Sequence, residues 1–71
     1  MYIDEQIELR EDLPERLKED FAELRQYYDA DDWMSFDRLF EVVEASVKAH
    51  YYAGVISRED LDTIFRKYGI L

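Results

Sequence analysis

The chain has 71 residues, of which 48% are apolar and 38% charged, and it contains no Cys. A chain of this length forms one domain at most, near the lower limit for a core that holds itself together. Its six Tyr, four Phe and one Trp exclude a disordered acidic tail, and the lack of Cys excludes disulfides and thiolate metal sites. We therefore expect a single helical domain over residues 1–71.

The net charge of −9 is concentrated in the amino-terminal half. Residues 1–32 hold twelve acids and four bases, which gives −8 for this segment alone. Such a field repels nucleic acid and anionic lipid and attracts a basic protein partner. The start of the chain lacks the features of a secretion signal, and no apolar run approaches the roughly 20 residues of a membrane span. We expect a cytoplasmic protein that binds neither nucleic acid nor membranes.

The first twelve residues fit two conformations. Ile3 and Ile7 are four residues apart, as on one face of a short helix, whereas Ile7 and Leu9 alternate as in an extended arm. Both interpretations stay open at this point.

A first long helix is predicted over residues 13–29. Its apolar positions are spaced by four, four, three and four residues, which is typical of one helix face. Asp12 and Glu15 predict a capping box, and Pro14 in the first turn has no N–H to leave unpaired. The apolar positions are 13, 17, 21, 24 and 28.

A second helix is predicted over residues 33–53, and the acidic stretch at 29–32 supplies carboxylates to cap its start. Its apolar stripe is wide enough to contact two neighbours, which favours a central position. Gly54 suits the left-handed residue that ends a helix. The stripe includes positions 33, 36, 39, 40, 43, 47 and 51, with His50 beside them.

A third helix is predicted over residues 57–68, with Ser57 as N-cap and a hydrophobic staple between Ile56 and Leu61. Gly69 ends it. Together these segments predict an all-α fold, a small three-helix bundle with a short additional N-terminal segment, helical or extended. The predicted core residues are Leu17, Phe21, Leu24, Phe36, Leu39, Phe40, Val43, Val47, Leu61, Ile64 and Phe65.

The stretch "AGVISREDLDTIF" at 53–65 resembles the second half of an EF-hand, but its chemistry argues against calcium. If Gly54 is the loop glycine, the ligand positions before it fall on Ala49, Tyr51 and Ala53, and the last position falls on Asp60. Calcium needs six to eight oxygen ligands, which these residues do not supply. Helix-boundary chemistry explains the match without an ion.

Asp29, Asp31, Asp32 and Asp37 are a second candidate for a cation site. No glycine provides a tight turn among them, and Asp is common at helix junctions because it caps helices. We interpret them as caps and expect no metal and no cofactor.

His50, the single histidine, lies one helical turn after Ser46, so the two can share a hydrogen bond. Nucleophilic catalysis also needs an orienting acid and an oxyanion hole, which this pair does not imply. We expect a protein that is not an enzyme.

Aromatic residues gather at the helix ends, in the pairs Tyr27–Tyr28 and Tyr51–Tyr52 and at Trp33. Adjacent residues on a helix diverge by about 100°, so one ring of each pair can enter the core while the other stays near the surface. Tyr27, Trp33 and Tyr52 are candidate partner contacts, since exposed Tyr and Trp often anchor interfaces. In the alternative interpretation they only flank the core.

The acidic residues Glu15, Glu19 and Glu23 lie on the outer side of the first predicted helix and are the other candidate partner contacts. Bases interspersed at three- and four-residue spacing favour a solvated face. The alternative is mimicry of a nucleic-acid backbone, which the net −8 supports and the four bases weaken.

The segments "EQIELREDLPE" at 5–15 and "GVISREDLDTIFRKYGI" at 54–70 resemble a group of short uncharacterised proteins carried on mobile elements of Gram-positive gut bacteria. The resemblance covers both ends of the chain and implies a cytoplasmic accessory protein. It brings no assigned chemistry and therefore no functional residues.

The sequence predicts a small acidic, non-catalytic protein-interaction or regulatory module with a basic protein partner. Because so small a core is weakly stable, we also expect a homodimer through helix 33–53 or the carboxy-terminal helix. The alternative function is a nucleic-acid mimic that inhibits a basic DNA- or RNA-binding enzyme.

Overall fold

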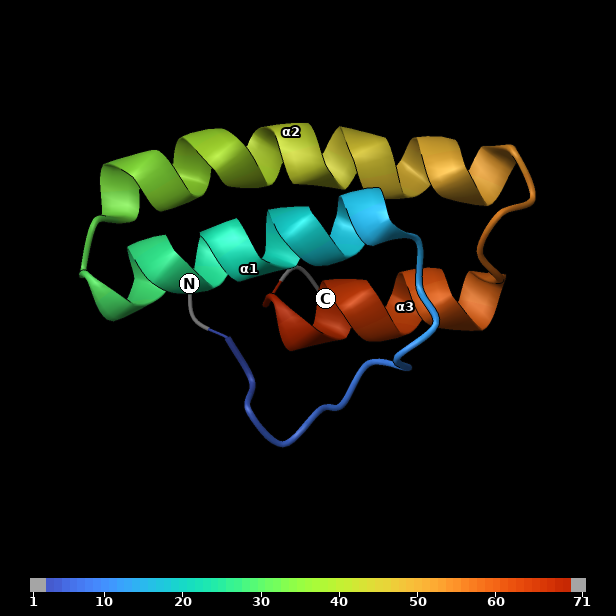
Figure 1. The fold of residues 1–71 in the computed structure, drawn as a ribbon, viewed down its shortest axis with the longest axis horizontal. Helices are drawn as coiled ribbons and strands as arrows, with labels where there is room; N and C mark the ends of the chain where they lie inside the picture. The colour runs from blue at the N-terminus through green and yellow to red at the C-terminus, as the bar shows by residue number, and fades with distance from the viewer. Residues whose placement is uncertain (1–2, 70–71) are drawn as a thin grey trace.

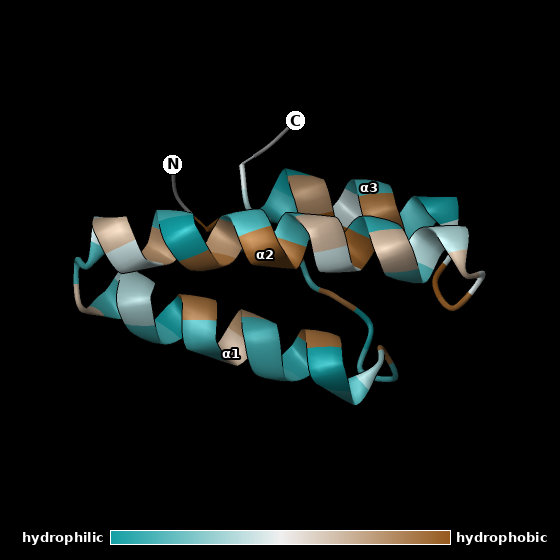
Figure 2. Cartoon of the chain, turned by 90° about the horizontal axis from the view of Figure 1, so that it is seen from above, coloured by the Kyte–Doolittle hydropathy of each residue, from teal (hydrophilic) through white to brown (hydrophobic). Residues whose placement is uncertain are grey.

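The computed structural model describes residues 3–69 and confirms the all-α class. It contains three helices, α1 (Glu15–Asp29), α2 (Trp33–Tyr52) and α3 (Arg58–Lys67). In Figure 1, α2 runs antiparallel to both other helices, and in Figure 2 α1 and α3 flank it. As predicted, α2 is central and packs against both neighbours.

The predicted start of the first helix is wrong by two residues. Asp12 does not form a capping box, because Pro14 occupies the N-cap position with ψ 139° and no side chain caps the helix. The ring of a proline disfavours helical geometry at the residue before it, which keeps Leu13 out of the helix. Asp12 instead forms an ion pair with Arg10.

The end of α1 uses an aspartate where glycine is usual. Asp31 has φ 55°, and the N–H groups of Asp31 and Asp32 donate to the Tyr28 and Tyr27 carbonyls at 3.2 and 3.0 Å. This is the Schellman arrangement, held at a cost of about 1 kcal/mol for a left-handed non-glycine residue. Asp32 then caps α2 by accepting from the Ser35 N–H, as the acidic stretch predicted.

The α2–α3 connection confirms the predicted helix boundary signals. Gly54 has φ 77°, and its N–H donates to the Tyr51 carbonyl at 3.0 Å. Ser57 caps α3, and Asp60 completes a capping box by accepting from the Ser57 N–H. Ile56 is buried beside this turn, in the place that a staple requires.

The core contains ten of the eleven predicted residues; the exception, Leu39, is only partly buried. Leu39 packs against the core but also lines an open groove with Tyr27 and Val42, which leaves part of its side chain in water. Four further residues complete the core: Ile3, Leu13, Ile56 and Tyr68.

Residues 3–14 form no helix; they make an extended arm with turns, which settles the open choice between the two conformations. The arm lies on the side of α1 and α3 that faces away from α2 (Figures 1 and 2). Its Ile3 and Leu13 side chains are buried. The Asp4 N–H donates to the Lys67 carbonyl at 2.7 Å, and Lys67 Nζ donates to the Ile7 carbonyl at 2.6 Å. The arm thereby joins α3 to the start of α1.

Candidate interaction surfaces

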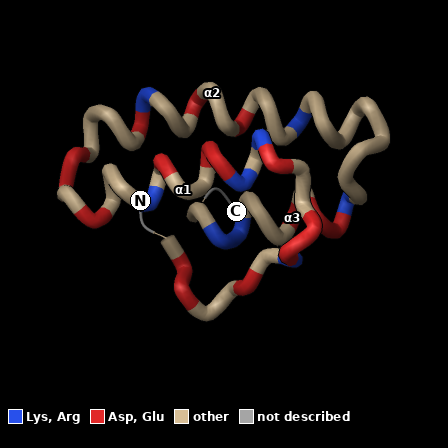
Figure 3. The backbone as a smooth tube through the Cα atoms, viewed as in Figure 1, with Lys and Arg blue, Asp and Glu red and all other residues tan. Residues whose placement is uncertain are grey.

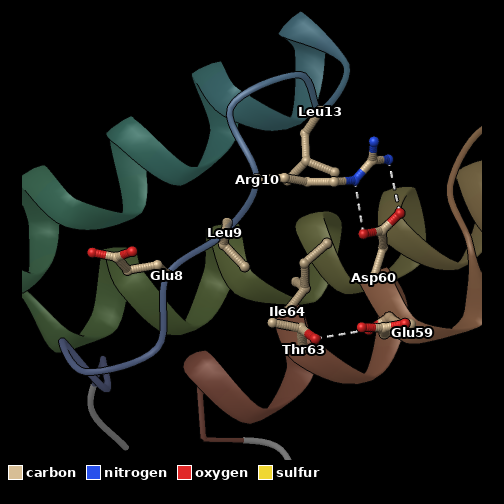
Figure 4. A pocket seen from close by; sticks show the side chains of 8 residues that line it. All are labelled: Glu8, Leu9, Arg10, Leu13, Glu59, Asp60, Thr63 and Ile64. Atoms are coloured by element: carbon tan, nitrogen blue, oxygen red, sulfur yellow. Dashed lines mark hydrogen bonds and ion pairs between the residues drawn. The ribbon is translucent and has the colours of Figure 1, made fainter.

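A hollow of about 180 Å³ lies between the arm and α3 (Figure 4). Arg10 reaches across it from the arm, and its Nε and Nη2 donate to the two Asp60 oxygens at 2.9 and 2.8 Å. Leu13 and Ile64 contribute apolar lining to the hollow. The Thr63 hydroxyl donates a hydrogen bond to the Glu59 backbone carbonyl. Both oxygens of Asp60 are therefore engaged in tying the arm to the helix cap.

The electrostatics of this link follow from its geometry. The Arg10 guanidinium, which donates to Asp60, holds the pKa of that carboxyl below its usual value, and the Ser57 N–H and hydroxyl act in the same direction. The Arg10 pKa is raised in return, chiefly by the same bidentate contact with Asp60. The pair is a charge-assisted fork that links residues 50 positions apart.

We expect Asp60→Asn to destabilise the fold by about 1 kcal/mol near pH 7, since the ionised cap and fork are both weakened. Because the folded pKa of Asp60 is lowered, its stabilisation is present above the ordinary value of 3.8 and is lost as pH falls through the folded pKa. The difference between variant and parent should therefore shrink in acid. Urea unfolding at neutral and acid pH measures it.

Asp62→Asn is the matched control, because Asp62 forms an exposed ion pair with Arg58 and caps nothing. It should change the free energy of unfolding by less than about 0.5 kcal/mol at either pH. A loss for Asp60→Asn that stays constant down to acid pH would contradict the ionised fork.

Most basic side chains of the described residues are already engaged. Six form ion pairs, and Lys67 donates to the Asp4 and Ile7 carbonyls. Figure 3 shows how acidic positions follow the arm and the α1–α2 connection. The acids without an ion pair in residues 3–69 are Asp4, Glu8, Glu11, Glu19, Glu23, Asp31, Asp32, Asp37, Glu41 and Glu59.

Two of the candidate aromatic residues, Tyr27 and Trp33, lie on either side of the α1–α2 connection, in different surroundings. Trp33 is 43% exposed, and its ring packs edge-on against Tyr28 with centroids 5.5 Å apart. Tyr27 is partly buried against the core, and its hydroxyl donates to Glu23 at 3.4 Å. Asp31, Asp32, Trp33 and Asp37 form what we call the acidic corner.

The remaining candidates lie elsewhere. Tyr52, at 80% exposed, stands at the other end of α2, about 28 Å from Trp33 along the helix. Glu15, Glu19 and Glu23 are exposed on α1, where Glu15 pairs with Lys18. The structure therefore does not combine the six predicted contacts into one site.

The candidate chemical residues have structural roles. His50 Nδ1 contacts the Ser46 backbone carbonyl at 2.7 Å, so the two residues share a hydrogen bond as predicted, and it is made to the backbone and not to the hydroxyl. Between residues 3 and 69, no three His, Asp or Glu side chains converge as metal ligands. In the same range no helix is long and apolar enough to cross a bilayer.

Sequence reasoning missed a second apolar face on α2. Val42 is 57% exposed and Met34 73% exposed, although both lie in the helix that supplies much of the core. The signal was the second spacing pattern along this helix, at 38, 42, 45, 49 and 52. It was hidden because the stronger core stripe runs along the same helix, at positions that alternate with those of the second pattern.

Comparison with known proteins identifies no family for this chain. The chain matches no family model, and neither a curated protein nor a solved structure shows significant similarity to it.

Proposed function

We propose that the protein is a non-catalytic interaction module that binds a basic segment of a protein partner at the acidic corner. One observation carries this proposal: a partly exposed indole, Trp33, is flanked by carboxylates that no base of the described chain neutralises. Arg38, which follows Asp37 in sequence, forms no ion pair among residues 3–69 and lines a groove with Leu39 and Val42. Arg25 is engaged by Asp29 and Glu5.

The corner offers the contacts that an arginine side chain uses. Trp33 is held by Tyr28 and Phe36, with centroids 5.5 and 6.1 Å away, so its ring is oriented before a partner arrives. Asp37 follows Trp33 by one helical turn and lies on the same side of α2. A guanidinium stacked on the indole can thus pair with a neighbouring carboxylate.

Two features of the sequence support an accessory role inside the cell. The absence of Cys fits a reducing cytoplasm, where we expect the protein to act. The resemblance of its two ends to proteins of mobile elements supports the same role.

The test uses a fluorescently labelled peptide of alternating Arg and Ser as probe. Trp33 is the single Trp, so its emission reports binding at the corner directly. Replacing Asp31, Asp32 and Asp37 with Asn removes three charges, while Asn still serves at an N-cap and in the left-handed region. We expect this variant to weaken binding about tenfold or more.

The matched control replaces Glu15, Glu19 and Glu23 with Gln, which removes the same charge from the outer face of α1. It should weaken binding less than about threefold at physiological salt, where separated charges are screened. Equal losses in the two variants, or an unchanged Trp33 emission on binding, would overturn the corner as the site.

The nucleic-acid mimic remains the second candidate because Glu19 and Glu23 are exposed on α1, one turn apart, and form no ion pair with any residue between 3 and 69. The Arg16–Asp20 and Lys18–Glu15 pairs interrupt that face. If the α1 variant loses more affinity than the corner variant, and affinity falls steeply with salt, the mimic replaces the proposed function.

A further inference from the structure

The outward side of α2 carries a second apolar face that no described part of the chain covers. We call it the outer stripe: Arg38, Val42, Ala45, Ala49 and Tyr52, edged by Met34, Glu41, Lys48 and Val55. Its members are exposed, and Met34, Val42, Tyr52 and Val55 are large apolar side chains in water. Figure 2, which looks down on α2, shows apolar bands along it.

The spacing of the outer stripe is that of a coiled-coil seam. Its positions follow one another by four, three, four and three residues, a repeat of 3.5 that suits packing of one helix against another. Ala45 and Ala49 at its centre leave room for close approach. Within α2, seam and edge extend over about 27 Å, from position 34 to position 52.

The edge of the stripe is complementary to itself when two copies lie antiparallel. In the register that places Val42 opposite Ala45 of the second copy, Glu41 faces Lys48 of that copy, and the two-fold axis repeats the pair. Glu41 has no ion pair among residues 3–69. Lys48 Nζ pairs with Glu44 at 3.2 Å and lies 6.0 Å from the centroid of the Phe65 ring, so it exchanges these exposed contacts for Glu41 of the second copy. The two ion pairs across the axis thus use an acid that the single chain leaves unpaired.

The same register also covers the apolar ends of the edge. Met34 then faces Val55 of the second copy. Val55 lines a shallow apolar hollow of about 250 Å³ with Ala49, His50 and Ala53. A flexible methionine fits such an irregular hollow.

Other arrangements lose this complementarity. A parallel pair sets Arg38 beside its own copy inside the seam, and a seven-residue shift of the antiparallel pair sets Lys48 opposite Lys48. Like charges in contact disfavour both. We propose that two copies of this chain associate through antiparallel α2 helices, in the register that pairs Glu41 with Lys48.

An interface formed by one helix from each copy buries a small area compared with most specific interfaces. We therefore expect a weak dimer with a Kd of about 10–100 µM. Each copy carries a charge of −9, and salt near 150 mM screens the repulsion between them. Sedimentation equilibrium at this salt should show the mass rising from 8.6 kDa toward twice that value with concentration.

Charge exchange tests the register. Glu41→Lys and Lys48→Glu should each weaken the dimer about tenfold or more, because each sets like charges opposite one another. The double variant E41K/K48E should recover the parent Kd within about threefold, since both pairs re-form with reversed sign. Glu19→Lys, with the same charge change on α1, is the control and should not weaken the dimer. Circular dichroism checks that each variant folds.

Cysteine cross-linking tests the direction, because the chain has no Cys of its own. A mixture of Met34→Cys and Val55→Cys chains should form a disulfide between the two variants, while Met34→Cys alone should not cross-link efficiently. A parent chain that remains at 8.6 kDa up to about 1 mM, a double variant as weak as the single ones, or efficient cross-linking of Met34→Cys alone would each overturn the proposal. The outer stripe adjoins the acidic corner, since Met34 follows Trp33 and Arg38 follows Asp37. Trp33 emission on addition of the peptide and the sedimenting mass of the chain alone therefore report on peptide binding and dimerisation by separate measurements.

Discussion

Phe36→Ala is expected to leave most of the chain unfolded at 25 °C. Phe36 is completely buried and its ring packs against Tyr28, Trp33 and Phe40. Removing a buried Phe side chain costs about 3–5 kcal/mol. A core of this size supplies only about 3–5 kcal/mol in total, so the substitution brings the free energy of unfolding to about zero or below. Far-ultraviolet circular dichroism and urea unfolding measure the loss.

Met34→Ala is the matched control for this prediction. It removes a long apolar side chain from the same helix two residues earlier, where the side chain is 73% exposed. At low protein concentration, where the chain is monomeric, it should change stability by less than about 0.5 kcal/mol. Phe36→Leu should remain folded with a smaller loss. A cooperative unfolding transition for Phe36→Ala at the parent's urea midpoint would contradict the packing around Phe36.

Ile3→Ala is expected to destabilise the fold by about 2–3 kcal/mol, although it lies outside every helix. The Ile3 side chain is buried, and the adjacent Asp4 N–H donates to the Lys67 carbonyl at the end of α3. Loss of the Ile3 side chain should therefore lower the local stability of α3 more than that of α2. Urea unfolding measures the global effect, and amide hydrogen exchange shows whether protection falls first in α3.

Gln6→Ala is the control for the arm, since Gln6 is exposed and only its backbone N–H bonds to Asp4. Its stability should be unchanged within about 0.5 kcal/mol. If Ile3→Ala is as mild as Gln6→Ala, the arm is not part of the core.

The two proposed surfaces respond to salt in opposite ways. Binding of a basic segment at the acidic corner relies on opposite charges, so salt weakens it. Association through the outer stripe brings together two chains of like charge, so moderate salt relieves repulsion there. Measuring both against ionic strength separates the surfaces even when one protein sample shows both kinds of binding.

The three helices could be predicted without the structure, because their signals are local. Apolar spacing gave each helix its inner face, and Gly54 and Ser57 marked a boundary through backbone conformation and a cap bond. Such signals depend on residues within one or two turns, so they can be read without knowing the fold. Where two local signals competed, at Asp12 and Pro14, proline prevailed because its ring restricts the backbone sterically.

The path of residues 3–14 and the arrangement of the surfaces depend instead on long-range packing. Ile3 and Leu13 are buried because α1 and α3 leave a space on the side away from α2, and no local pattern encodes that space. The contact between Arg10 and Asp60, which are 50 residues apart, likewise depends on the arm lying beside α3. The exposure of Val42 follows from which face of α2 its two neighbours cover. Long-range packing thus set which apolar residues form the core and which remain available to a partner.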